Sequence, residues 1–228
     1  MIYLVGDIHG KIDIAKLNPK NFPQGNTLTK KDYVIVLGDF GLLWSNNDKE
    51  RYWLKWLDSR PWTTLFLDGN HENFDMINKL PLIAKFGGIV GKVSDSIYHL
   101  RRGEIYIING KKFFVFGGAN SIDKKMRTIG ISWWPEEIPS YAEMNKGLDN
   151  LEKHGFCVDY VLTHTCPNKI VGLIDKMYED ETDPTRIFLD DVDKRTTFKK
   201  WFFGHWHDDL EFFDEKYIML YDVIRGLG

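Results

Sequence analysis

Residues 64–72 read Thr-Leu-Phe-Leu-Asp-Gly-Asn-His-Glu, a short apolar run followed directly by a cluster of polar residues. The run Thr64–Leu67 has the length and composition of a buried β-strand, and the glycine that follows marks its end. The cluster Asp68–Glu72 brings carboxylate, amide and imidazole groups together within one short segment. This stretch predicts a strand whose C-terminal end carries functional side chains.

The same pattern of an apolar strand ending in polar residues recurs along the chain. The further runs and the loops after them are Ile2–Val5 with Gly6–Gly10, Tyr33–Leu37 with Gly38–Gly41, Tyr160–Leu162 with Thr163–Thr165, and Lys200–Phe203 with Gly204–His207. In an α/β sheet, the loops that follow the C-terminal ends of parallel strands lie along one edge, where ligands bind. We therefore expect polar residues from distant segments to meet at one site.

Helices and hairpins are predicted between these strands. Helical spacing or capping motifs indicate helices over Asn47–Ser59, over Asn73–Leu80, from the Ser140–Glu143 capping box onward, and over Thr185–Val192 after Asp183-Pro184. Hairpin turns are indicated at Asn109-Gly110 and at Asp214-Glu215. This alternation predicts a layered α/β sandwich with mixed sheets. Since no stretch has the composition of a linker, we expect residues 1–228 to form a single domain.

Composition excludes several classes of protein. The chain has 228 residues, of which 43% are hydrophobic and 28% charged, as in ordinary globular proteins. Its net charge of −3 is too small for a general nucleic-acid or membrane surface. No apolar run approaches the roughly 18 residues of a membrane span, and Met1–Val5 lacks the basic start of a signal peptide. We therefore expect a cytoplasmic protein with no membrane partner.

Seven side chains in the post-strand loops form a candidate set of metal ligands. They are Asp7, His9, Asp39, Asn70, His164, His205 and His207. Their nitrogen and oxygen donors suit manganese, iron, zinc, nickel or magnesium better than copper(I). The set is too large for one tetrahedral site and matches two adjacent metals that share a carboxylate. Taken singly, each motif has a structural explanation as a turn, a helix cap or a packed histidine, but together they favour a functional site.

The ordered motifs resemble those of the calcineurin-like metallophosphoesterase superfamily. The series Gly-Asp-x-His, Gly-Asp, Gly-Asn-His-Glu, His and Gly-His-x-His extends from Asp7 to His207, nearly the whole chain. The resemblance is to a bacterial and phage-type branch, because a glycine-rich loop and a Trp-Trp-Pro-Glu-Glu stretch follow in the middle of the chain. It implies a four-layer α/β/β/α sandwich around a dinuclear metal site, with manganese favoured and iron, zinc, nickel or magnesium as alternatives.

Carried over by motif, the resemblance divides the ligands between two metals. The first metal would take Asp7, His9, Asp39 and His207. The second would take Asp39, Asn70, His164 and His205, so that Asp39 bridges the two. His71 would be the general acid that protonates the leaving group, and an imidazole titrates in the range that this role needs.

The second motif departs from that of the Ser/Thr protein phosphatases in the same superfamily. Leu42 stands where those enzymes have an aspartate that orients the catalytic histidine, and Leu43 stands where they have a phosphate-gripping arginine. The departure counts against a protein-phosphatase mechanism. It also leaves His71 without its expected partner, for which Glu72 and Asp75 are the candidates in the sequence.

The middle of the chain supplies candidate substrate-binding residues. The glycine-rich loop from Gly117 to Asp123 contains Asn120 and leads to Arg127, which is a candidate to replace the missing phosphate-binding arginine. Trp133 and Trp134 offer flat surfaces on which a base could stack. For each of these residues a purely structural role in a loop, lid or core is the alternative.

Three functions remain open from the sequence. The leading hypothesis is a phosphoesterase that uses a metal-activated water on phosphodiesters or nucleotides, with nucleic-acid ends as further substrates. The alternative is a phosphomonoesterase of the Ser/Thr protein phosphatase type. A non-catalytic interaction scaffold on the same fold is the remote third, because every ligand position is intact. The sequence predicts neither the natural substrate nor the oligomeric state.

Overall fold

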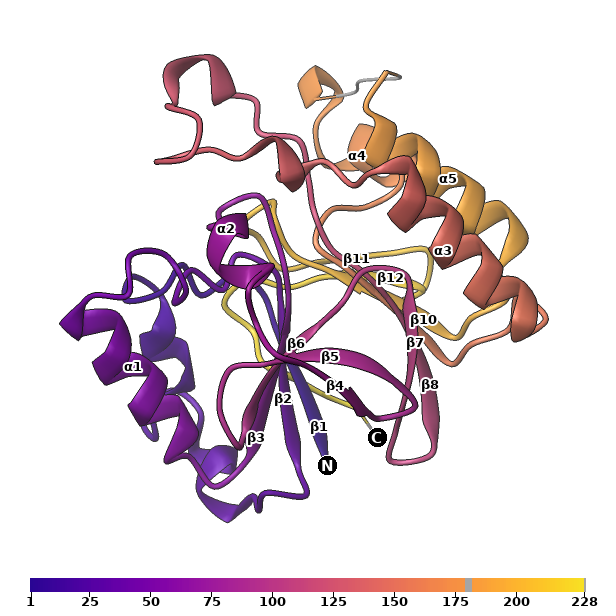
Figure 1. Cartoon of the computed structure of the whole chain (residues 1–228). Coiled ribbons are helices and arrows are strands. Elements are labelled where there is room, and N and C mark those ends of the chain that lie inside the picture. The colour runs from indigo at the N-terminus through magenta and orange to yellow at the C-terminus, as the bar shows by residue number, and fades with distance from the viewer. Residues whose placement is uncertain (179–181, 228) are drawn as a thin grey trace.

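Two mixed β-sheets pack face to face in the computed structural model, which describes residues 1–178 and 182–227 (Figure 1). The first sheet has the spatial order β13 (Arg225–Leu227), β1 (Ile2–Val5), β2 (Tyr33–Leu37), β3 (Thr63–Leu67), β6 (Ile97–Leu100), β5 (Gly88–Lys92) and β4 (Leu82–Lys85). The second has the order β11 (Leu210–Phe212), β12 (Tyr217–Met219), β10 (Lys200–Phe203), β9 (Tyr160–Thr163), β8 (Lys111–Phe116) and β7 (Glu104–Ile108). In both sheets the central strands are parallel and antiparallel strands close the edges.

Helices cover the outer faces of both sheets (Figure 1). The α-helices are α1 (Asp48–Asp58), α2 (Phe74–Ile77), α3 (Tyr141–Lys153), α4 (Asn168–Ile174) and α5 (Pro184–Arg195). Short 3₁₀ helices are η1 (Ile14–Leu17), η2 (Pro23–Thr27), η3 (Lys124–Met126), η4 (Pro135–Glu137) and η5 (Lys176–Tyr178). Helices α3, α4 and α5 lie on the second sheet, whereas α1 lies on the outer side of the first.

Three apolar cores separate the layers, and the alternation of side chains along each strand divides the residues among them. In β2, Ile35 faces the core between the sheets, whereas Val34 and Val36 face the core beneath α1. In β8, Phe113 joins the central core and Phe114 packs beneath the helices of the second sheet. The predicted four-layer α/β/β/α arrangement is therefore confirmed.

The predicted elements with strong local signals are confirmed. Asn109 and Gly110 have φ of 51° and 74°, the left-handed pair that a tight turn between β7 and β8 requires. The Ser140 capping box begins α3, and the Asp183 side chain caps α5 by accepting two backbone N–H groups. The helix predicted over Asn73–Leu80 is wrong in length, because only the turn Phe74–Ile77 is helical. Strands β4, β5, β6 and β13 and helix α4 were not predicted.

Across residues 1–178 and 182–227, no helix has both the length and the apolar character needed to cross a membrane.

Candidate metal centre and substrate cleft

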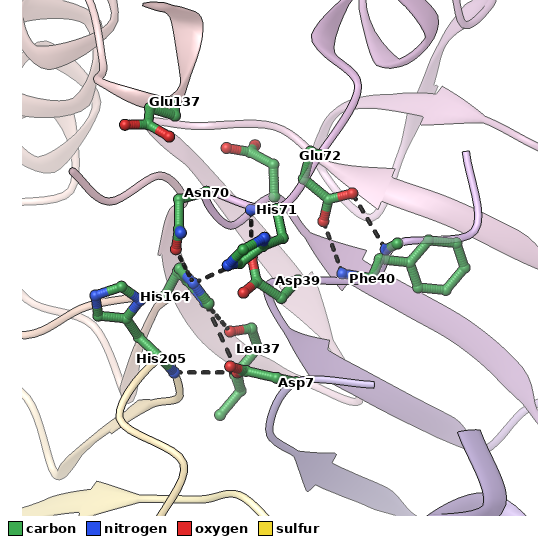
Figure 2. Close-up of polar contacts among 12 residues, drawn as sticks. Asp7, Leu37, Asp39, Phe40, Asn70, His71, Glu72, Glu137, His164 and His205 are labelled. Atoms are coloured by element: carbon green, nitrogen blue, oxygen red, sulfur yellow. Dashed lines mark hydrogen bonds and ion pairs between the residues drawn. The ribbon is translucent and has the colours of Figure 1, made fainter. Parts of the chain in front are cut away.

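The candidate ligands meet where the C-terminal ends of parallel strands from both sheets come together. Figure 2 shows Asp7, Asp39, Asn70, His164 and His205 converging from loops that follow β1, β2, β3, β9 and β10. The carboxylates of Asp7 and Asp39 and the His164 ring are almost wholly buried. The structure thus brings together residues from five segments that the sequence placed after strand ends.

One group of ligands surrounds Asp7. Its Oδ2 lies 3.2 Å from Nε2 of His207 and 4.0 Å from Nε2 of His9. Nε2 of His9 also lies 3.3 Å from Oδ2 of Asp39. Asp7, His9 and His207 each offer a donor atom, and these atoms lie within 4.8 Å of one another, so the three side chains could hold a metal ion.

A second group surrounds His164. Its Nε2 lies 3.3 Å from Oδ1 of Asp39 and 3.1 Å from Oδ1 of Asn70. Its Nδ1 lies 2.8 Å from the carbonyl oxygen of Leu37, so Nδ1 carries the hydrogen and donates it to that carbonyl. This bond leaves the lone pair of Nε2 directed at the two oxygens, as in histidines that ligate metals. The His205 ring lies beside that of His164, with the ring centroids 4.9 Å apart.

The donor set fits divalent metal ions. Oδ2 of Asp7 is buried and accepts no hydrogen bond from the described residues, a costly state for a carboxylate oxygen unless a cation satisfies it. The two oxygens of Asp39 face different groups, Oδ2 toward His9 and Oδ1 toward His164. Imidazole nitrogens with carboxylate and amide oxygens suit the divalent metals that the sequence predicted.

The backbone at this site is held in an uncommon conformation. His9, Asp39, His205 and His207 have φ of 42°, 46°, 72° and 54°, in the left-handed region that non-glycine residues rarely adopt. Such conformations persist where the surrounding structure fixes them, often at functional sites. A Cβ atom on Gly69 would lie 2.0 Å from Oδ1 of Asp39, so only glycine lets this carboxylate approach.

Charges within the cluster shift the pKa values of the ligands. Burial raises the pKa of Asp39, but His164 and His9 outweigh it and hold this pKa far below its usual range. Burial lowers the pKa of His9, but the hydrogen bond and charge of Asp39, with Asp13, raise it to about 9. Burial together with His164 lowers the pKa of His205 to about 3. The protein side chains alone therefore hold a proton at His9, and a metal ion would take the place of such a proton.

His71 lies beside the ligands and contacts Arg127. Its backbone N–H donates to Oδ1 of Asp39 at 2.8 Å. The Arg127 guanidinium nitrogens lie 3.1 Å and 3.2 Å from Nδ1 and Nε2 of the His71 ring. The two ring nitrogens point in different directions, so one planar guanidinium reaches both only by lying over the ring. Burial lowers the pKa of His71; Asp39 opposes this shift and Arg127 reinforces it.

Neither candidate carboxylate from the sequence orients His71. Glu72 is buried, and its carboxylate accepts the backbone N–H groups of Phe40 at 2.7 Å and Gly41 at 3.2 Å (Figure 2). Asp75 accepts a hydrogen bond from Nε1 of Trp134 at 3.0 Å. The expectation that Glu72 or Asp75 partners His71 is therefore wrong. Each carboxylate is instead occupied in fixing a neighbouring loop.

A cleft of about 270 Å³ opens over the ligands. Asn120 and Arg127 line it together with His71, and Oδ1 of Asp123 holds the Arg127 side chain through an ion pair of 2.8 Å. The cleft is also lined by Arg186, which the sequence analysis missed. Arg186 is buried in the first turn of α5, where the helix dipole disfavours a positive charge. An arginine at this unfavourable position, two residues after Pro184, was the feature of the sequence that could have indicated a functional role.

Other residues singled out from the sequence lie away from the cleft. Neither Trp133 nor Trp134 lines it, and Trp134 is 4% exposed with its ring edge-on to Trp44. The structure therefore lends no support to base stacking by these two residues. Leu42 and Leu43 are packed into the core beneath α1.

Comparison with solved structures agrees with the layered fold. The phosphopantetheinyl hydrolase PptH of Mycobacterium tuberculosis matches with a TM-score of 0.50 and 14% identity, over 96% of this chain and 87% of that one. A putative 5′-nucleotidase of Staphylococcus aureus, in complex with α-ketoglutarate, matches with a TM-score of 0.48 and 14% identity, over 96% of this chain and 48% of that one. At 14% identity the likeness to the hydrolase concerns the fold alone, and the likeness to the nucleotidase is too weak to support an argument. No curated protein matches the chain in sequence.

Comparison with a family model covers most of the chain. The model of the calcineurin-like phosphoesterase family matches residues 1–209, which include every candidate ligand. The match agrees with the order of motifs in the sequence and with the cluster of histidine, aspartate and asparagine side chains at the strand ends. The chain therefore belongs to the calcineurin-like phosphoesterase family and is a phosphoester hydrolase.

Proposed function

We propose that the chain is a phosphodiesterase that works with two divalent metal ions, manganese being favoured, and that His71 is its general acid. The position of Asp39 carries this proposal. Its Oδ2 lies 3.3 Å from Nε2 of His9, and its Oδ1 lies 3.3 Å from Nε2 of His164. A carboxylate between two separate groups of donors is what a pair of adjacent metals requires. When bound, such a pair neutralises phosphate charge and lowers the pKa of water.

The protein side chains have separate tasks in this proposal. Asp7, His9 and His207 bind the first metal, Asn70, His164 and His205 bind the second, and Asp39 is shared. Arg127 and Arg186 bind the phosphate oxygens that face the cleft. His71 delivers a proton to the oxygen of the leaving group. The hydrogen bond from its backbone N–H to Asp39 holds His71 beside the carboxylate that the two metals would share.

The charge balance of the cleft supports a diester substrate. A phosphodiester carries one negative charge at phosphorus, whereas a phosphomonoester carries up to two. Leu42 and Leu43 are packed in the core, so the usual arginine of the protein phosphatases has no counterpart there. Arg127 is already paired with Asp123, which reduces the positive charge that it offers. Nucleotides, cyclic nucleotides and nucleic-acid ends are the candidate substrates.

One observation favours the alternative of a phosphomonoesterase. Two arginines, Arg127 and Arg186, line the cleft, and two cations could hold a dianionic terminal phosphate. Asp123 lines the same cleft and offsets part of that charge. We therefore place the diesterase first and let a substrate comparison decide.

The test is a comparison of kcat/KM across four substrates with protein loaded separately with manganese, iron, zinc, nickel and magnesium. The substrates are bis(p-nitrophenyl) phosphate, a 2′,3′-cyclic nucleotide, p-nitrophenyl phosphate and a phosphoserine peptide. We expect metal-dependent hydrolysis that is fastest on the two diesters. A preference for the phosphoserine peptide would instead establish the phosphomonoesterase. Metal content of each sample, measured on the same protein, shows whether activity follows two bound ions.

A further inference from the structure

A second cavity of about 330 Å³ adjoins the metal-binding cluster. His9 and His71 line it. Four further residues that do not line the cleft also contribute to its wall, namely Trp44, Trp53, Lys11 and Lys49. Trp44 lies in the loop before α1, and Trp53 lies within α1. The cavity volume falls within the range of pockets that bind small molecules.

The indoles of Trp44 and Trp53 form an apolar part of the wall of this second cavity. Both indoles are half-buried, and the edge of the Trp134 ring packs against Trp44 with the ring centroids 5.2 Å apart. The Glu50 carboxylate fixes the loop because it accepts the backbone N–H groups of Trp44 at 3.1 Å, Ser45 at 2.9 Å and Asn46 at 2.8 Å. The cavity is therefore preformed, and Glu50 is occupied by the loop.

The position of His71 relates the two cavities. The candidate ligands Asp39, Asn70, His205 and His207 line the cleft, so the phosphorus of a substrate belongs there. His71 lines both the cleft and the second cavity. A general acid must reach the leaving oxygen, so a leaving group bonded to that oxygen would extend past His71 into the second cavity.

We propose that the second cavity binds the leaving group and that this group is a nucleoside, an inference that rests on the proposed function. The indoles of Trp44 and Trp53 offer flat apolar surfaces to its base, and stacking on such surfaces holds bases of any sequence. Lys11 and Lys49 line the cavity together with Glu50, and the two lysines favour a neutral leaving group over a cationic one. The site therefore releases a nucleoside and leaves the phosphate on the other half of the diester.

The bonding changes follow from this placement. The oxygen of a water molecule bonds to phosphorus, and the bond from phosphorus to the nucleoside oxygen breaks with its electron pair going to that oxygen. The proton of His71 moves to the same oxygen, which gives a neutral nucleoside alcohol. A proton from the attacking water then restores His71, so the products are a nucleoside and a phosphomonoester of the other alcohol.

The direction of cleavage gives the first test. Adenosine 5′-(methyl phosphate) is hydrolysed either to adenosine and methyl phosphate or to AMP and methanol. If the second cavity binds the nucleoside, the products are adenosine and methyl phosphate. The products are measured by chromatography after reaction with the manganese-loaded full chain. AMP and methanol as the main products would overturn the proposal while leaving the diesterase function intact.

Variants of Trp53 give the second test. We expect Trp53→Ala to lower kcat/KM for the adenosine ester about tenfold more than for trifluoroethyl methyl phosphate, whose leaving group has no ring, the size of one stacked base. Trp53→Phe keeps a flat ring and should restore most of the difference. Tyr141→Ala, which removes an exposed tyrosine at the start of α3, is the control. Equal losses on both esters would show a structural role for Trp53 and overturn the proposal.

Binding of adenosine separates this inference from the proposed function. Calorimetric titration of the manganese-loaded protein with adenosine needs no turnover, so it decides even if neither ester is hydrolysed. The cavity assignment would be supported if Trp53→Ala weakens this binding about tenfold and Tyr141→Ala preserves it. Absence of adenosine binding at millimolar concentration would overturn it, whatever the activity on other diesters.

Discussion

Replacing Asp39 by asparagine tests the shared ligand directly. The carboxylate presents Oδ2 to Nε2 of His9 and Oδ1 to Nε2 of His164, each at 3.3 Å. Asparagine has a single acceptor oxygen, and the backbone N–H of His71, which donates to Oδ1 at 2.8 Å, would keep that oxygen on the His164 side. The amide NH₂ would then face His9. The first metal would lose a ligand outright, whereas the second would keep a neutral oxygen.

The expected losses differ between the two metals for this reason. Removal of a partner that only orients a ligand typically costs 10–100-fold in metal affinity. Loss of the oxygen itself should therefore weaken the first metal by more than about 100-fold, and loss of charge alone should weaken the second by about 10-fold. The assay is elemental analysis after dialysis against a series of buffered free Mn²⁺ concentrations. His207→Ala and Asn70→Ala calibrate it, because each removes a ligand from one group only.

A matched control separates lost ligation from lost charge. Asp95 is a surface aspartate that pairs with Lys92 at 2.7 Å, so Asp95→Asn removes the same charge far from the ligands. We expect this variant to bind both ions as the parent protein does. Two-metal occupancy of Asp39→Asn at parental free-metal concentrations would refute the shared role. Equal loss of affinity for both ions would refute the expected orientation of the asparagine amide, but it would leave intact the proposal that Asp39 is shared by the two metals.

The remaining predictions concern the acid, the cleft and the core. His71→Ala should keep both metals and lose about 10²–10⁴-fold in kcat on a diester with a poor leaving group, but far less with p-nitrophenolate; equal losses would contradict the role of acid. Arg127→Ala should raise KM more than it lowers kcat if the guanidinium only binds phosphate, which steady-state kinetics on one diester checks. Arg102→Met should lower the free energy of unfolding in urea by about 3 kcal/mol, because it leaves the buried Asp68 carboxylate with His99, 2.9 Å away, in place of two partners; a loss below about 1 kcal/mol would count against the Arg102–Asp68 pair.

Local signals explain why much of the fold could be predicted from the sequence. The caps at Ser140 and Asp183 act within a few residues, so their side chains and the backbone groups that they bind lie in the same short segment. The central parallel strands are buried on both faces and therefore appear as unbroken apolar runs. Strand β4 (Leu82–Lys85) alternates between exposed and half-buried residues at a sheet edge, and nothing local distinguishes it from a loop.

The candidate ligands were predictable for a different reason. Each follows a strand, and parallel strands carry their ends to one edge, so the sheet converts a sequence pattern into a spatial cluster. The contacts around His71 follow no such rule. Arg127 lies 56 residues from His71, and Trp134 lies 59 residues from Asp75, with each pair joined by loops whose course the sequence does not specify. The contacts of the cleft residues were therefore the hardest to predict, and Arg186, in the first turn of α5, was missed altogether.

The Gly-Asn-His-Glu motif acts as one unit that couples two strand ends. Gly69 leaves room for the Asp39 carboxylate, since a Cβ atom there would lie 2.0 Å from its Oδ1. The backbone N–H of His71 then donates to that same oxygen, and the Glu72 carboxylate accepts the backbone N–H groups of Phe40 and Gly41, in the loop that contains Asp39. Asn70 lies between these anchors, so its amide oxygen reaches the second group of ligands in a fixed position. The glutamate therefore serves the candidate metal centre by holding the backbone of the neighbouring loop, which explains why this buried carboxylate, next to His71 in the chain, is not a partner of the His71 ring.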